Sequence, residues 1–130
     1  MPRLSTHVLD TSRGRPAAGI PIELHRIGDA GRTRLATAVT NADGRTLVAT
    51  AITNSDGRTD APLLQSDRLD VGTYELTFRV GPYLKRVSPS LPDPPFLDDV
   101  VVRVGIAEPG GNYHVPLLLS PHGYSVYRGS

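Results

Sequence analysis

Glycine and proline interrupt this chain so often that short strands joined by turns are favoured over long helices. The sequence holds 13 glycines and 12 prolines among 130 residues, about a fifth of the chain against about 12% in an average protein. Between them, apolar and polar side chains alternate, as in half-buried strands. The stretches expected to form strands are residues 3–10, 20–27, 33–40, 73–80, 100–106, 113–119 and 124–128.

One short helix is expected over residues 82–87, with Pro82 at its first position. Pro116 cannot donate a hydrogen bond to a sheet, so the strand over residues 113–119 is expected at an edge or a bulge. Turn signals recur about every ten residues, which is typical of sandwiches. The sequence therefore predicts an all-β fold, an antiparallel β-sandwich with one short helix, as a single domain over residues 1–130.

Composition excludes several classes of protein. The chain has no cysteine, which excludes disulfide scaffolds and thiolate zinc sites. Fourteen basic against thirteen acidic residues give a net charge of +1, so no nucleic-acid partner is indicated. No apolar run approaches the ~20 residues of a membrane span. No apolar segment follows Arg3, so no secretion signal is visible and a cytoplasmic location is expected.

A tandem repeat lies in the first half of the chain. Residues 35–46 and 48–59 are identical at nine of twelve positions, and the other three changes are conservative. Solenoid proteins need longer repeats and at least three copies. The doublet is therefore interpreted as a local duplication of one strand and the Asp-Gly turn that follows it.

Candidate chemical groups concentrate near the two ends of the chain. Three of the four histidines could in principle bind zinc, but they lack the paired spacing of a metal motif. Residues 4–10 read LSTHVLD, and the C-terminal segment runs from YHVPLLLSP to a final YRGS. Taken alone, these segments also fit an ordinary strand and an ordinary terminal hairpin.

Together the segments resemble the 5-hydroxyisourate hydrolases of the transthyretin-related proteins. The matching blocks are residues 4–11 with Gly14 and 16–17, 54–58 with 62–64, 74–76, 95–97, 113–121 and 127–130. The final tetrapeptide is the most specific of them, because it separates these hydrolases from hormone-carrying transthyretins. Asn112, where the family often has another histidine, and the duplication depart from the pattern.

The resemblance implies a sandwich of the transthyretin type that opens the lactam ring of 5-hydroxyisourate in urate breakdown. Hydrolysis needs an activated water, a stabilised oxyanion and a proton for the leaving nitrogen, which suits imidazole and guanidinium groups. It also implies that no metal or other cofactor is needed and that the chain forms a homotetramer, a dimer of dimers. The implied catalytic residues are His7, Arg58, His114 and Ser130, and the implied substrate-binding residues are Tyr127, Arg128 and Gly129.

Two other functions share this fold class. A transthyretin-like carrier of small ligands would be expected to replace the histidines and the arginine by apolar residues. A structural or adhesive sandwich would usually be exported or embedded in a longer chain. Neither expectation fits the sequence as well as the hydrolase does.

The duplication offers two candidate arginines, Arg45 and Arg58, each at the end of an Asp-Gly-Arg turn. We expect the second copy to fill the strand position, because extra residues after the catalytic turn would leave its arginine poorly positioned. Residues 41–47 are then expected to form an exposed turn with Arg45 in solvent, while Arg58 faces His7 and His114. His25 shares a strand face with Glu23 and is expected to face solvent.

Overall fold

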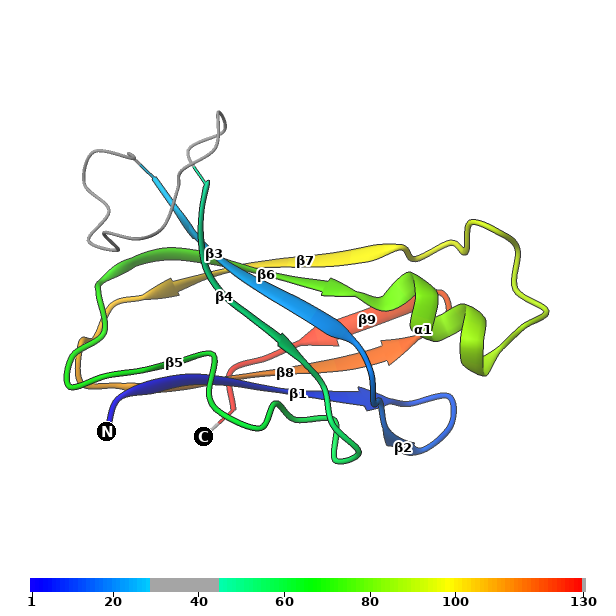
Figure 1. Cartoon of the computed structure of the whole chain (residues 1–130), viewed down its shortest axis with the longest axis horizontal. Coiled ribbons are helices and arrows are strands. Elements are labelled where there is room, and N and C mark those ends of the chain that lie inside the picture. The colour runs from blue at the N-terminus through cyan, green and yellow to red at the C-terminus, as the bar shows by residue number, and fades with distance from the viewer. Residues whose placement is uncertain (29–44, 130) are drawn as a thin grey trace.

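The computed structural model describes residues 1–28 and 45–129, which form two β-sheets and one helix (Figure 1). The elements, in chain order, are β1 (Arg3–Asp10), β2 (Arg15–Pro16), β3 (Pro21–Ile27), β4 (Arg45–Ile52), β5 (Leu64–Gln65), β6 (Gly72–Arg79), α1 (Val80–Val87), β7 (Asp99–Ile106), β8 (Asn112–Ser120) and β9 (Gly123–Val126).

The two sheets divide the strands into two layers. One sheet has the order β2-β1-β8-β9, with β5 also paired to β1, and the other has the order β4-β3-β6-β7. Within the described residues every strand pair is antiparallel except β1 and β8, which run parallel. The predicted antiparallel sandwich is confirmed, with one parallel pair at the centre of the first sheet.

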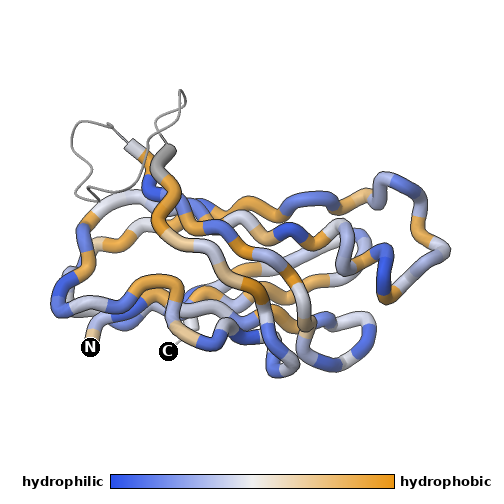
Figure 2. The backbone as a smooth tube through the Cα atoms, in the orientation of Figure 1, coloured by the Kyte–Doolittle hydropathy of each residue, from blue (hydrophilic) through white to orange (hydrophobic). Residues whose placement is uncertain are grey.

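Alternating side chains form the core between the layers, as the sequence pattern predicts. Leu4, Thr6 and Val8 of β1 are buried, as are Ile22 and Leu24 of β3. Figure 2 shows hydrophobic positions alternating with hydrophilic ones along the strands. The same alternation leaves every second residue of β1 on the outer face of its sheet.

The predicted helix is confirmed, but it begins two residues earlier than expected. Val80 and Gly81 precede Pro82, so the proline is the third helical residue. The first turn has no intrahelical acceptors for its N–H groups, so a proline there removes no helix bond. Tyr83 and Leu84 are buried on the face that packs against the sandwich.

Pro116 does not mark an edge strand, and that prediction is wrong. β8 lies between β1 and β9, and its register with β1 runs without a shift from Asn112 to Leu119. The pairing of β8 with β9 begins only at Leu117, one residue after the proline. A central strand tolerates Pro116 because the second ladder starts beyond it.

The second copy of the repeat fills the strand position next to β3, as expected. β4 pairs with β3 from Arg45 opposite Ile27 to Ile52 opposite Pro21. The strand predicted over residues 33–40 and the turn residues 41–44 lie outside the described residues. Residues 45–47 belong to β4 rather than to an exposed turn, because β3 is long enough to keep them paired.

A buried carboxylate connects the end of β1 to the helix. Asp10 is 1% exposed, and its Oδ2 accepts a hydrogen bond of 2.7 Å from the hydroxyl of Tyr83. Its Oδ1 accepts bonds from the backbone and hydroxyl of Ser12 and from the backbone of Arg13. Asp10 therefore fixes both the β1–β2 loop and the position of α1.

Removing the phenolic hydroxyl should destabilise the fold through this carboxylate. We expect Tyr83→Phe to lower the free energy of unfolding by about 1–3 kcal/mol, because it leaves a buried oxygen without its donor. Urea denaturation at fixed protein concentration measures the change. Tyr124→Phe, which removes the hydroxyl of a residue that is 47% exposed, is the control and should change little. Equal stability of the two variants would contradict this role of Asp10.

Candidate active site

Polar side chains gather on the outer face of the first sheet, where β1 and β8 lie side by side. Ser5 and His7 alternate with the buried residues of β1 and point away from the core. The parallel register sets Arg3 opposite Asn112 and Ser5 opposite His114. Residues more than a hundred positions apart in sequence are therefore neighbours on one surface.

The turn after β4 brings the arginine to this surface. The backbones of Arg58 and His7 form an antiparallel bridge, and Gly57 O accepts a 2.8 Å hydrogen bond from Val8 N. The turn lies along the edge of β1, between the short stretches at which β5 and β2 pair with the same strand. The edge of β1 thus carries Arg58 next to His7.

Asn54 closes this turn, and Gly57 allows the turn to approach β1. The side-chain oxygen of Asn54 accepts hydrogen bonds from the backbone N–H groups of Asp56 and Arg58, at 2.9 and 3.2 Å. Gly57 has φ +73°, and a Cβ there would lie 2.3 Å from Val8 O. Only glycine fits this position, so the Asp-Gly sequence fixes where the arginine can stand.

A cavity of about 220 Å³ opens between these elements. Its lining residues are Arg3, Ser5, Arg58, Asn112, Tyr113 and His114. Within residues 1–28 and 45–129, neither Arg3 nor Arg58 forms an ion pair with a carboxylate. Among the described residues, the two guanidinium groups that line this cavity therefore have no carboxylate partner, an arrangement that suits an anionic ligand.

Both histidines of the site are held towards the neutral form. Burial lowers the pKa of His7, and the nearby Arg58 lowers it further, against a hydrogen bond with the backbone of Asp56. Burial also lowers the pKa of His114, together with the charges of Arg58, His7 and Arg3, against a hydrogen bond with the backbone of Ser5. A neutral imidazole can take a proton, so both rings are available as bases near neutral pH.

The C-terminal tail reaches the site through one glycine. The backbone N–H of Gly129 donates a 2.8 Å hydrogen bond to His114 O, and a Cβ on Gly129 would lie 2.7 Å from His114 Cδ2. Tyr127 and Arg128 instead line a separate cavity of about 360 Å³ between β7 and β9, where Arg128 lies 4.2 Å from the ring centre of Tyr113. Ser130 lies outside the described residues.

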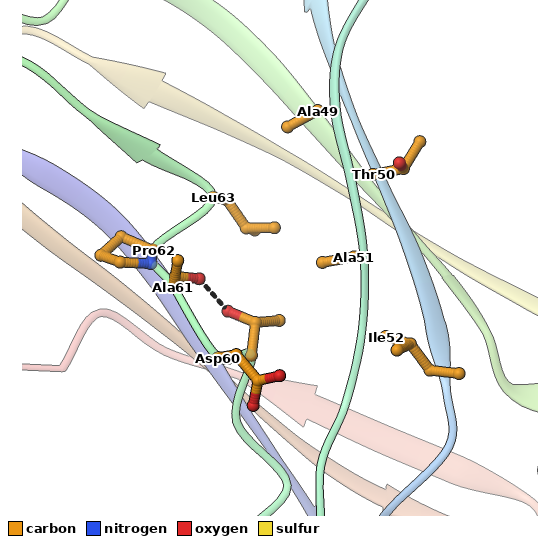
Figure 3. Close-up of a pocket in the computed structure, with 9 residues that line it drawn as sticks. Ala49, Thr50, Ala51, Ile52, Asp60, Ala61, Pro62 and Leu63 are labelled. Carbon is orange, nitrogen blue, oxygen red and sulfur yellow. Dashed lines mark hydrogen bonds between the residues drawn. The ribbon is translucent and has the colours of Figure 1, made fainter.

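Another hollow of about 320 Å³ lies between β4 and the segment after the Arg58 turn (Figure 3). Ala49, Ala51 and Leu63 contribute much of its lining, and Asp60 is its one charged residue. The described residues that line it include no imidazole or guanidinium group, so it is separate from the predicted catalytic residues.

The remaining histidines lie elsewhere. His25 is on β3, in the other sheet, and is half-buried rather than solvent-facing as expected, while His122 is exposed and packs its ring against Phe96. Within the described parts of the chain, no three histidine or acidic side chains gather as metal ligands would. None of the helical structure described there is long and apolar enough to cross a membrane.

Sequence reasoning overlooked Arg3 and Ser5 as residues of the site. Both line the cavity with His114, and both share the face of His7 by the two-residue period of a strand. That period was visible in the sequence. The sequence did not show which residues lie opposite them in the sheet, because that depends on the parallel pairing of β1 with β8.

Comparison with known proteins finds relatives along almost the whole chain. The model of the HIUase/Transthyretin family matches residues 4–48 and 45–129, two pieces that overlap where the tandem repeat lies. A 5-hydroxyisourate hydrolase of Mesorhizobium japonicum is 50% identical over 98% of this chain and 92% of its own.

Solved structures agree as well. A crystal structure of (S)-allantoin synthase superimposes with a TM-score of 0.83 at 39% identity, over 99% of this chain and 44% of that longer one. The 5-hydroxyisourate hydrolase of Klebsiella pneumoniae gives 0.73 at 31% identity over the whole of both chains. The chain therefore belongs to the HIUase/Transthyretin family.

Proposed function

We propose that this protein hydrolyses 5-hydroxyisourate to 2-oxo-4-hydroxy-4-carboxy-5-ureidoimidazoline, a step of urate degradation. The observation that carries the proposal is the cavity lined by Arg58 and His114, with His7 bridged to Arg58 through the backbone and both rings held towards neutrality. Relatives named as 5-hydroxyisourate hydrolases along the full length of the chain support it.

The proposed chemistry divides the three tasks of lactam hydrolysis among these groups. One neutral imidazole takes a proton from water while the oxygen of that water bonds to the carbonyl carbon. The guanidinium of Arg58 stabilises the oxyanion that forms. The C–N bond then breaks, and an imidazolium returns a proton to the leaving nitrogen. Water supplies every atom that is added and no electron is transferred, so the step needs no redox cofactor. The proposal gives the tasks that a metal performs in other hydrolases, activating water and stabilising the oxyanion, to imidazole and Arg58.

A carrier of apolar ligands fits the site less well. Such a protein needs an apolar channel, whereas here two guanidinium groups, a serine, an asparagine and a histidine line the cavity. The cost of leaving those groups unpaired against an apolar ligand would weaken binding. The same groups suit an oxygen-rich anion, which is why the hydrolase is preferred.

The proposal includes a homotetramer with Ser130 and the tail near the catalytic groups, and a cytoplasmic location. Gly129 supports the placement of the tail, because it contacts His114 directly. The outer strands β7 and β9 and the exposed Tyr124 and Tyr127 are typical interface material. Sedimentation would measure the assembly, and fractionation of cells would locate the protein.

The three central groups should each be required for the reaction. In an assay that follows the near-ultraviolet band of freshly prepared 5-hydroxyisourate, the wild type should accelerate its decay without added cofactor. We expect His7→Ala, His114→Ala and Arg58→Ala each to lower kcat/KM by about 10²–10⁴, the range for losing one such group. Arg45→Ala and His25→Ala are the matched controls and should stay near wild type. Loss of activity in Arg45→Ala but not in Arg58→Ala would reverse the choice of arginine.

The pH profile should reveal a neutral histidine base. Because the pKa of each ring is lowered, the base stays unprotonated at pH 7 and is lost only as pH falls through values below 6.5. We expect kcat/KM to be level near neutrality and to decline on the acid side. Arg3→Gln removes one charge that lowers the pKa of His114 and should move this decline to higher pH. A rate independent of pH from 5 to 8 would exclude histidine as the base.

The tail should matter through its contact with His114. Deleting residues 127–130 should reduce both kcat/KM and assembly, measured by the same assay and by sedimentation. Gly129→Ala should reduce activity alone, because the new Cβ would displace the ring of His114. Gly110→Ala, where an added Cβ meets nothing within 4 Å, is the control. A fully active tetramer lacking residues 127–130 would refute the role of the tail.

A further inference from the structure

Ser5 makes a direct side-chain contact with a histidine of the proposed site. Its Oγ lies 2.9 Å from Nδ1 of His114, a normal hydrogen-bond distance. The two residues are opposite one another in the parallel ladder of β1 and β8, and both are half-buried. The backbone ladder therefore sets this contact.

Ser5 also approaches the ring with its backbone. The backbone of Ser5 acts to raise the pKa of His114, which is the effect of a carbonyl oxygen beside an imidazole. A carbonyl oxygen can only accept, so a ring nitrogen that bonds to it must carry hydrogen. A serine hydroxyl can accept as well, and both oxygens of Ser5 can then share one N–H group.

The other side of the ring faces different chemistry. Gly129 packs against Cδ2, the carbon next to Nε2. The guanidinium groups of Arg3 and Arg58 line the same cavity, and such groups donate but never accept. Because Ser5 occupies Nδ1, a guanidinium that bonds to the ring does so at Nε2, which must then present a lone pair.

We propose that Ser5 holds His114 in the tautomer with hydrogen on Nδ1, which leaves Nε2 as the basic atom of the ring. Ser5 is thus a positioning residue that acts through His114. The state of the ring concerns the free protein, whereas its effect on turnover rests on the proposed function.

Two isosteric variants separate the hydroxyl from the size of the side chain. Ser5→Thr keeps a hydroxyl on the same strand face, and Ser5→Val has almost the same shape without it. Nitrogen-15 NMR of histidine-labelled protein reads the tautomer above the pKa of the ring, with the signals of His114 identified by their absence in His114→Gln. We expect the Nδ1–H form in the wild type and in Ser5→Thr, and a mixture of both tautomers in Ser5→Val.

Turnover provides the second readout. We expect Ser5→Val to lower kcat by about 10- to 100-fold, the range seen when a partner that orients a metal-bound histidine is removed, with a smaller change in KM. Ser5→Thr should retain most of the rate. An Nε2–H tautomer in the wild type, or an unchanged tautomer and kcat in Ser5→Val, would overturn the inference. A wild type that holds the Nδ1–H form but does not hydrolyse 5-hydroxyisourate would refute the proposed function and leave the tautomer assignment supported.

Discussion

The parallel pairing of β1 with β8 is the constraint on which the rest of this molecule depends. It joins the first strand to the eighth in continuous register over the whole of β1. On the inner face it supplies adjoining core residues, and on the outer face it sets Ser5 beside His114. A slip of one residue would exchange these faces, so the packing of the core also fixes the register of the proposed site.

The edge of β1 shows how short pieces of chain can share one strand. β5 pairs at its start, Arg58 bridges to its middle and β2 pairs at its end. Because none of these partners is long, the edge has room for a turn that carries a guanidinium group. Gly57 makes that room usable, since any side chain would collide with Val8 O. The turn therefore needs glycine at position 57 for lack of space, just as the proposed chemistry needs arginine at position 58.

Strand alternation made much of the fold predictable, because one buried face leaves a clear period of two in β1 and β3. The edge position predicted from Pro116 was wrong. A missing N–H excludes a central position only where a strand pairs on both sides of the proline, and the pairing with β9 begins one residue later. Arg58 was selected from the direction of the chain after its turn. Arg3 and Ser5 were overlooked, although they share the face of His7, because a strand pattern does not say which strand lies next to it. The parallel pairing depends on the whole topology and produces no pattern in the sequence of either strand.

The contact between Ser5 and His114 spans 109 positions of sequence, and Gly129 completes the surroundings of the ring. Chains with such distant contacts fold slowly, because the entropy cost of closing a large loop comes before the contacts that offset it. During synthesis β1 emerges before β8 and the tail. In the finished molecule Arg3 pairs with Asn112 and Gly129 bridges to His114, so both segments lie at the start of β8. A nascent chain consequently carries Ser5 before it carries His114, and the contact between them forms only after β8 has been synthesised.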